Sequence, residues 1–142
     1  MLLVDTNVLI DVLENDPLWA DWSIHQLRTQ AQIHPLIINP IIYAELSLAF
    51  STFEALDAVL KTLEIELREV PRPALFLAGK AFASYRKLGG NKTGVLPDFL
   101  IGAHAAVQSW PLLTRDARRY RTHYPSLELL TPEKAACAWG QV

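Results

Sequence analysis

Four acidic residues of this 142-residue sequence lie next to segments whose apolar composition predicts a buried core. They are Asp5, Glu45, Asp98 and Asp116. Carboxylates that gather in one place repel each other unless a cation neutralises them, and hard ions such as Mg²⁺ or Mn²⁺ prefer oxygen ligands. Such an ion lowers the pKa of a bound water and stabilises the leaving oxygen of a phosphate ester. The four acids therefore predict a divalent-metal site with the chemistry of phosphodiester hydrolysis.

A basic run from residue 114 to residue 121 surrounds the fourth acid. It contains four arginines, of which Arg115, Arg118 and Arg119 are the candidate contacts for a phosphate backbone. The net charge of −2 hides an asymmetry, because residues 1–66 hold ten acids and two bases whereas residues 67–142 hold five acids and eleven bases. Such polarisation is typical of a local footprint for an acidic partner. The alternative interpretation is a solvated charged face, which is the commoner role of a charge run.

The elements that must position these residues follow from the apolar pattern. Short apolar runs bounded by turn residues predict strands over 2–4, 35–39, 67–70, 112–114 and 127–130. Between them we predict helices over 8–13, 18–32, 41–50, 53–66 and 73–88, and a further helix opened by Pro97. This alternation indicates an α/β fold with a five-stranded parallel sheet flanked by helices on both faces. The length predicts a single domain over residues 1–142.

The predicted topology brings two of the four acids to one edge of the sheet. Ligands of parallel sheets bind at the carboxyl ends of the strands, so Asp5 and Asp116 lie together if the first and fourth strands are neighbours. We expect Glu45 in the middle of its helix and buried near the metal, because the residues around it are apolar. The position of Asp98 does not follow from this topology.

The composition excludes several classes of protein. With 51% hydrophobic and 20% charged residues, the chain is not intrinsically disordered. The single cysteine, Cys137, can form neither an internal disulfide nor a Cys-ligated zinc site, which fits a reducing cytoplasm. No uninterrupted apolar run approaches the ~18–20 residues of a membrane-spanning helix, and the acid at Asp5 is unlike the basic start of a signal peptide. We therefore expect a soluble, unprocessed, cytoplasmic protein that has no membrane partner.

Four segments, in this order, resemble the motifs of PIN-domain nucleases, and most of all the VapC-type toxins of bacterial toxin–antitoxin pairs. They are Val4-Asp5-Thr6-Asn7, Glu45, the segment from Pro97 to Ala105, and Leu113-Thr114-Arg115-Asp116. The resemblance extends over essentially the whole chain. It implies a five-stranded parallel sheet and an RNA endonuclease that depends on Mg²⁺ or Mn²⁺.

The same resemblance implies roles for individual residues and for partners. The acidic quartet that carries catalysis and holds the metal would be Asp5, Glu45, Asp98 and Asp116. Thr6, Asn7 and Thr114 would be supporting polar groups, with Asn7 and Thr114 orienting carboxylates or water. The fourth acid varies within the family. The implied partners are an RNA substrate, a small cognate antitoxin protein and a second copy of the chain in a homodimer.

Other interpretations of these residues stay open. Taken singly, Asp5 after a strand is as typical of a helix cap as of a catalytic group. Asp98 taken singly is typical of an acid at a helix start, where the helix dipole favours it. A strand that ends in an aspartate also resembles a phosphatase with Asp5 as nucleophile, although these enzymes commonly carry a second aspartate where this chain has Asn7. A catalytically silent RNA- or protein-binding module is the third interpretation, and the retention of all four acids argues against it.

Overall fold

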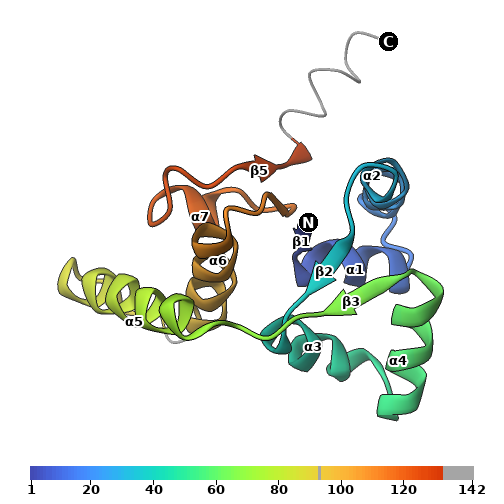
Figure 1. The fold of residues 1–142 in the computed structure, drawn as a ribbon, viewed down its shortest axis with the longest axis horizontal. Coiled ribbons are helices and arrows are strands. Elements are labelled where there is room, and N and C mark those ends of the chain that lie inside the picture. The colour runs from blue at the N-terminus through green and yellow to red at the C-terminus, as the bar shows by residue number, and fades with distance from the viewer. Residues whose placement is uncertain (93, 133–142) are drawn as a thin grey trace, which may run out of the picture.

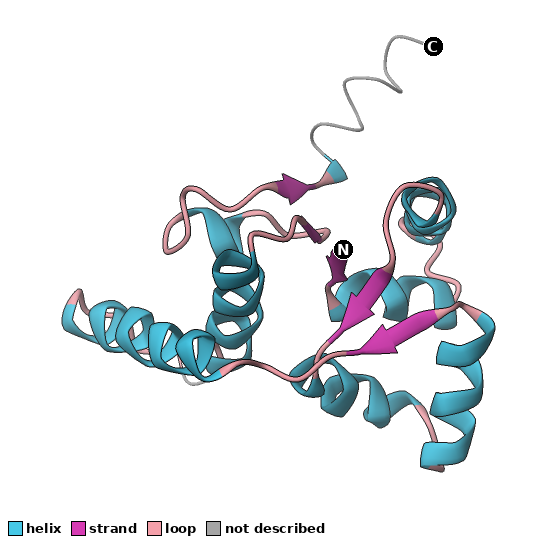
Figure 2. Cartoon of the chain, in the orientation of Figure 1, coloured by secondary structure: helices cyan, strands magenta, loops and turns pink. Residues whose placement is uncertain are grey.

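The computed structural model describes residues 1–92 and 94–132, and its helices and strands alternate along the chain (Figure 1). The strands, drawn as short arrows in Figure 2, are β1 Leu2–Val4, β2 Leu36–Ile38, β3 Ile65–Leu67, β4 Leu112–Leu113 and β5 Leu129–Leu130. The helices are α1 Thr6–Leu13, α2 Ala20–Ala31, α3 Pro40–Leu46, α4 Phe53–Thr62, α5 Arg72–Lys87, α6 Leu96–Gln108 and α7 Arg118–Arg121. A 3₁₀ turn, η1 Ser47–Ala49, follows α3.

All five strands are parallel and lie in one sheet in the order β3-β2-β1-β4-β5. The central strand β1 pairs on both sides, since Leu3 is in register with Ile37 of β2 and with Leu112 of β4. The strand order therefore reverses between β1 and β4. Because crossovers between parallel strands are right-handed, α1–α4 cover one face and α5 and α6 the other. The predicted α/β fold is confirmed.

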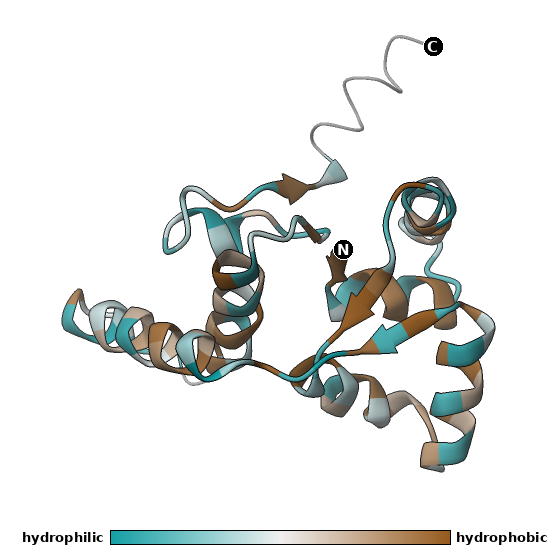
Figure 3. Ribbon diagram, viewed as in Figure 1, coloured by the Kyte–Doolittle hydropathy of each residue, from teal (hydrophilic) through white to brown (hydrophobic). Residues whose placement is uncertain are grey.

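The hydropathy of the strands follows their position in the sheet. β1 and β2 are buried along their whole length, whereas the edge strand β3 exposes Glu66 and Leu67. Figure 3 shows the same contrast, with β2 hydrophobic throughout and a hydrophilic stretch in β3. The carboxyl ends of β1 and β4 therefore leave the buried centre of the sheet.

Several predicted boundaries are wrong by a few residues. The helix predicted over 53–66 ends at Thr62, because Glu64 adopts a left-handed backbone conformation (φ 56°) that turns the chain back into the sheet. The third strand is therefore Ile65–Leu67 rather than 67–70. The helix predicted over 41–50 gives way to η1 after Leu46, so Glu45 lies in the last turn of α3 and not in its middle.

Helix α6 packs closely against the segment that follows β4. A Cβ atom on Gly102 would lie 2.5 Å from the ring of Tyr124 and 3.1 Å from that of Tyr120. A side chain at this position would have to displace both rings, so glycine permits the close approach. As a result, Tyr120 is fully buried beside the carboxyl end of β1.

Two further predictions concern membrane-spanning helices and the C-terminal end of the sequence. None of the described helices is long and apolar enough to cross a membrane. Residues 133–142, which include Cys137 and complete the single domain predicted over 1–142, lie outside the described residues.

Candidate active site

Asp5 occupies the point between β1 and β4 where the strand order reverses, and it is only 1% exposed. It caps the N-terminus of α1, where its Oδ1 accepts a hydrogen bond from the backbone N–H of Thr6 (2.8 Å). Its Oδ2 accepts two more, from the hydroxyls of Thr114 (2.8 Å) and Tyr120 (2.7 Å). Burial raises the pKa of Asp5, and these hydrogen bonds oppose the rise because they favour the carboxylate. Three donors and the sheet therefore fix its position.

Thr114 connects Asp5 to the segment that follows β4. While donating to Asp5, its hydroxyl accepts from the backbone N–H of Asp116 (3.2 Å) and from Nδ2 of Asn7 (3.4 Å). The Oδ1 of Asn7 accepts in turn from the backbone N–H of Arg115 (3.1 Å). Asn7 and Thr114 thus orient the stretch of chain that carries Asp116.

Glu45 reaches this region from the last turn of α3. It is partly buried, and its Oε1 accepts a hydrogen bond from the hydroxyl of Thr6 (2.6 Å). The N-cap of the same helix is Asn39, whose Oδ1 accepts from the helix backbone and whose Nδ2 lies 3.2 Å from Nδ1 of His104. Burial lowers the pKa of His104, so its neutral ring accepts this bond. The pair ties the helix of Glu45 to α6, which carries Asp98.

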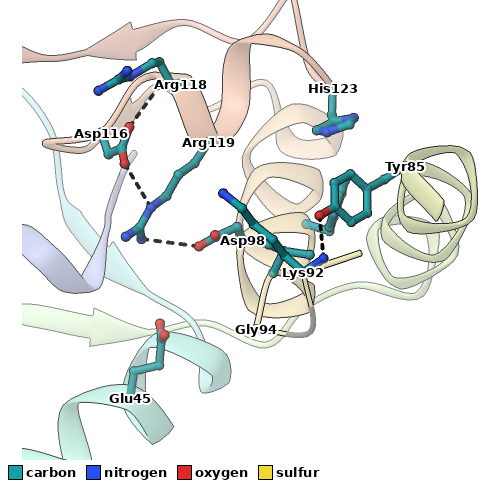
Figure 4. Close-up of a pocket in the computed structure, with 11 residues that line it drawn as sticks. Glu45, Tyr85, Lys92, Gly94, Asp98, Asp116, Arg118, Arg119 and His123 are labelled. Atoms are coloured by element: carbon teal, nitrogen blue, oxygen red, sulfur yellow. Dashed lines mark hydrogen bonds and ion pairs between the residues drawn. The ribbon is translucent and has the colours of Figure 1, made fainter. Parts of the chain in front are cut away.

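Asp98 and Asp116 lie on either side of the Arg119 guanidinium (Figure 4). The Nη1 of Arg119 is 3.5 Å from Oδ1 of Asp98, and its Nε is 3.2 Å from Oδ2 of Asp116. Asp98 stands in the first turn of α6 with 19% of its side chain exposed, whereas the side chain of Asp116 is 40% exposed. Arg119 is therefore the counter-ion of both acids.

The pKa of Asp98 is raised from 3.8 to about 6. Burial is the largest cause and Arg119 opposes it, while the carboxylates of Asp5, Glu45 and Asp116 raise this pKa further. Because each of these three acids acts on Asp98, the four acids singled out from the sequence share one electrostatic environment.

A pocket of about 750 Å³ opens at this environment. Its acidic lining consists of Glu45, Asp98 and Asp116, and Arg118 and Arg119 supply positive charge beside them. Figure 4 shows these side chains entering the pocket from α3, from α6 and from the segment after β4. Asp5 does not line the pocket, since the groups that hydrogen-bond to it bury it.

Another part of the pocket is lined by the aromatic side chains of Tyr85 and Phe99, together with His123 and Lys92. The ring of His123 lies 4.6 Å from that of Phe99 and 5.9 Å from that of Tyr85, measured between centroids. The hydroxyl of Tyr85 accepts from the backbone N–H of Lys92 (3.0 Å), which holds the loop between α5 and α6 at the pocket (Figure 4). A Cβ on Gly90 would collide with the Tyr85 ring, so a larger residue there would displace the ring.

The donor set suits a hard divalent ion, because the acids that line the pocket offer oxygen atoms only. Within residues 1–92 and 94–132, however, no three carboxylate, histidine or cysteine side chains are grouped closely enough to hold an ion. The guanidinium of Arg119 lies between Asp98 and Asp116 and forms an ion pair with each of them. A metal ion bound to these two carboxylates would take the place of Arg119.

Arg115, which the sequence predicts as a phosphate contact, forms an ion pair with a residue of α1. Its Nε forms an ion pair with Oδ2 of Asp11 (2.9 Å), a side chain that is 2% exposed. Its guanidinium carbon lies 5.4 Å from the centre of the Trp19 ring. Arg115 thus packs against α1 and the start of α2, whereas Arg118 and Arg119 lie at the main pocket.

Sequence reasoning missed Tyr85, Tyr120 and His123 as parts of this site. A signal for Tyr120 existed, because Ala117, Tyr120 and Tyr124 are spaced by three and four residues, as on the buried side of a helix. Tyr85 and His123 had no such signal, since their place at the pocket depends on how α5 and α7 pack against α6.

The family model described as PIN domain matches residues 2–123 of this chain. Among curated protein sequences, none matches it.

Three solved structures are similar to this chain over most of their length. VapBC2 from Rickettsia felis, bound to a DNA fragment from its promoter, has a TM-score of 0.71 and 21% identity, over 92% of this chain and 97% of that one. VapBC-1 from nontypeable Haemophilus influenzae has a TM-score of 0.69 and 18% identity, over 92% and 96%. A toxin-antitoxin complex from Klebsiella pneumoniae has a TM-score of 0.61 and 21% identity, over 93% and 98%. At these identities the likeness establishes the fold.

Proposed function

This chain belongs to the PIN domain family, and from that premise we propose that it is a metal-dependent endoribonuclease, the toxin of a toxin–antitoxin pair. The observation that carries the proposal is the convergence of Glu45, Asp98 and Asp116 on one pocket next to the buried Asp5. Three separate elements supply these acids, and burial together with the carboxylates of Asp5, Glu45 and Asp116 raises the pKa of Asp98. Clusters of this kind are typical of functional sites.

The chain's own residues have distinct roles in this proposal. Glu45, Asp98 and Asp116 would hold Mg²⁺ or Mn²⁺ at the pocket, and Asp5 would complete the acidic quartet from its buried position behind them. The ion would supply an activated water and a charge partner for the leaving oxygen. Thr6, Asn7 and Thr114 orient the acids through the hydrogen bonds described above. Arg118 and Arg119 would bind the phosphates of the substrate, and Arg119 is available for this role whenever its guanidinium is not paired with the two aspartates.

The proposed partners follow from the same site and from the structural neighbours. One neighbour is described as a toxin-antitoxin complex, which supports a cognate antitoxin for this chain. The position of Arg119 between Asp98 and Asp116 supports it too, because it demonstrates that a cationic side chain fits between these acids. We extend the proposal to a homodimer that acts in the cytoplasm.

A phosphatase with Asp5 as nucleophile is less well supported. Both oxygens of Asp5 already accept hydrogen bonds, and the residue is 1% exposed, so a phosphate ester has no access to it. The silent binding module differs from the nuclease in one observable only, which is whether bound RNA is cut.

Incubation of the purified protein with single-stranded RNA, with Mn²⁺ or with EDTA, tests the proposal. We expect cleavage with the metal and none with the chelator, together with discrete 5′ ends when the cut RNA is sequenced. Full cleavage in EDTA by a nuclease-free preparation would sink the metal mechanism. RNA binding without cleavage in Mg²⁺ and Mn²⁺ would identify a silent module, and a trapped phosphoenzyme would identify the phosphatase.

The toxin role is tested separately, in cells. We expect expression of the wild-type chain alone to stop growth, and co-expression with the small protein encoded beside it to restore growth. If expression of an enzyme that is active in vitro is harmless, the nuclease proposal stands and the toxin proposal is wrong.

A further inference from the structure

A second, smaller pocket of about 250 Å³ lies next to the first. Asp116, Arg118 and Arg119 line both pockets, so these residues form the wall between them. The smaller pocket is also lined by Trp19 and Arg115, two side chains to which the proposed cleavage reaction gives no role.

Trp19 is held in a fixed position while remaining partly exposed. The turn before α2 is fixed by Asp16, whose Oδ1 accepts from the backbone N–H groups of Leu18 and Trp19 (2.9 Å each). Trp22 packs edge-on against Trp19, with 6.3 Å between ring centroids and 84° between ring planes. An aromatic ring supported in this way offers a large contact area at little cost in conformational entropy.

Arg115 lies over the ring of Trp19, and both side chains line the smaller pocket. Its guanidinium carbon lies 5.4 Å from the centre of the indole ring, and its Nε lies 2.9 Å from the buried carboxylate of Asp11. The hydroxyl of Ser23 also donates to this carboxylate (3.0 Å), which fixes Asp11 in turn. Because Asp11 already neutralises Arg115, the guanidinium is a poor phosphate contact. Nucleobases stack on both aromatic rings and arginine planes, so Trp19 and Arg115 are of the residue types that bind a base.

We infer that this second pocket binds one unpaired base of a single-stranded RNA next to the phosphate held by Arg118 and Arg119. The inference rests on the proposed ribonuclease function. The pocket is smaller than the ~300–1,000 Å³ of drug-sized ligand sites, so it fits a single base. Because the arginine wall separates the two pockets, a strand with its phosphate on that wall has a base at Trp19 on one side and the acids on the other.

Binding of a fluorescein-labelled single-stranded RNA, measured by anisotropy in EDTA, tests the role of Trp19. Trp19→Ala is expected to weaken binding about 5- to 100-fold, the range that stacking of one base produces. Trp19→Phe keeps an aromatic surface and is expected to retain most of the affinity. Trp22→Phe is the matched control, because Trp22 contacts Trp19 but does not line the pocket. Thermal melting of each variant checks that it is folded.

Abasic scanning of the same RNA distinguishes a base pocket from general packing. Removing one particular base is expected to weaken binding to the wild type and to have no effect on binding to Trp19→Ala. With metal present, Trp19→Ala is expected to raise KM and to leave kcat nearly unchanged. The inference is wrong if each abasic position affects both proteins equally.

The two proposals fail in distinguishable ways. If the wild type cuts RNA with metal, and Trp19→Ala binds and cuts it equally well, the base pocket is wrong and the ribonuclease stands. If the wild type neither binds nor cuts RNA, the ribonuclease is wrong and the base pocket is wrong with it.

Discussion

The candidate site has a buried half and an open half, which hold their acids by different means. Asp5 in the buried half is 1% exposed and accepts three hydrogen bonds from neutral donors. Asp98 and Asp116 in the open half are 19% and 40% exposed and share the guanidinium of Arg119. The fold therefore fixes the first acid, whereas a long, flexible side chain balances the other two.

This difference separates the stability of the fold from the metal affinity and pH dependence of the site. Donors to Asp5 come from the core and keep their places without a metal, so changes there affect the stability of the fold. Arg119 is 46% exposed and neutralises acids that a metal would otherwise bind, so changes there affect metal affinity and pH dependence. Substitutions in each half test this division.

The largest effect is expected from Asp98→Asn in the open half. The change keeps the size of the side chain and removes one charged oxygen ligand. We expect metal-dependent RNA cleavage to fall by more than the roughly 10–100-fold typical of changes behind the metal ligands. The melting temperature of the metal-free protein should be unchanged or higher, since burial and the carboxylates of its neighbours already disfavour the charge on Asp98.

Asp21→Asn is the matched control for that prediction. Asp21 also stands in the first turn of a helix, α2, but it is exposed and does not line either pocket. Its substitution should leave cleavage unchanged. Near-wild-type cleavage by Asp98→Asn would show that the open half does not carry the chemistry.

The next largest effect is expected from Tyr120→Phe in the buried half. Tyr120 is fully buried and its hydroxyl donates to the Asp5 carboxylate, so its loss should lower the free energy of unfolding by about 1–3 kcal/mol. Tyr124→Phe is the matched control, because that hydroxyl donates to the neutral backbone carbonyl of Phe99 (2.8 Å) and both rings pack against Gly102. Urea denaturation should show a larger loss for Tyr120→Phe. Equal losses would contradict the idea that Asp5 depends on its donors.

The buried half was the more predictable from sequence. An apolar run that ends in Asp5 and another that ends before Thr114 predict two strands, and in a parallel sheet such ends share one edge. The pairing of β1 with β4 then brings these two residues into contact. The sequence does not predict that these two strands are neighbours, because no local pattern encodes strand order.

The open half was predictable only as a set of residue types. The closeness of Asp98 to Asp116 depends on how α6 packs against α7, a four-residue helix that the sequence pattern did not predict. The engagement of Arg115 with Asp11, and not with the acids of the larger pocket, likewise depends on long-range packing. A run of arginines predicts positive charge, but it does not predict which guanidinium finds a buried partner.

A smaller effect, on metal affinity, is expected from Arg119→Gln. Exposed ion pairs contribute about 0.2–1 kcal/mol, so removing the competing guanidinium should tighten Mn²⁺ binding by about two- to fivefold. Calorimetric titration without RNA measures this. Arg118→Gln is the control, because within the described residues the structure shows no ion pair of its guanidinium. Weaker Mn²⁺ binding by Arg119→Gln would mean that Arg119 supports the metal site.

The smallest effect is expected in the pH dependence of the metal-free protein. The pKa of Asp98 is about 6 in the folded state and 3.8 without the protein environment, so the native state binds more protons than the unfolded state between these values. Its contribution to the free energy of unfolding therefore falls as pH rises from about 4 to about 6, and is constant above. A pKa difference of about two units corresponds to at most about 3 kcal/mol. Arg119 faces Asp98 from α7 and solvent reaches the side chain, so we expect the measured difference to be well below that limit.

Asp98→Asn isolates this contribution from the other acids that face it, Asp5, Glu45 and Asp116, because those remain in both proteins. In EDTA, the difference in unfolding free energy between variant and wild type should grow between pH 4 and pH 6 and then level off. In Mn²⁺ at pH 7.5 the order should reverse, since only the wild type gains the full stabilisation of a bound ion. A difference that is independent of pH, and a wild type that Mn²⁺ does not stabilise, would mean that Asp98 is a helix-terminal acid and that the open half is a surface ion pair.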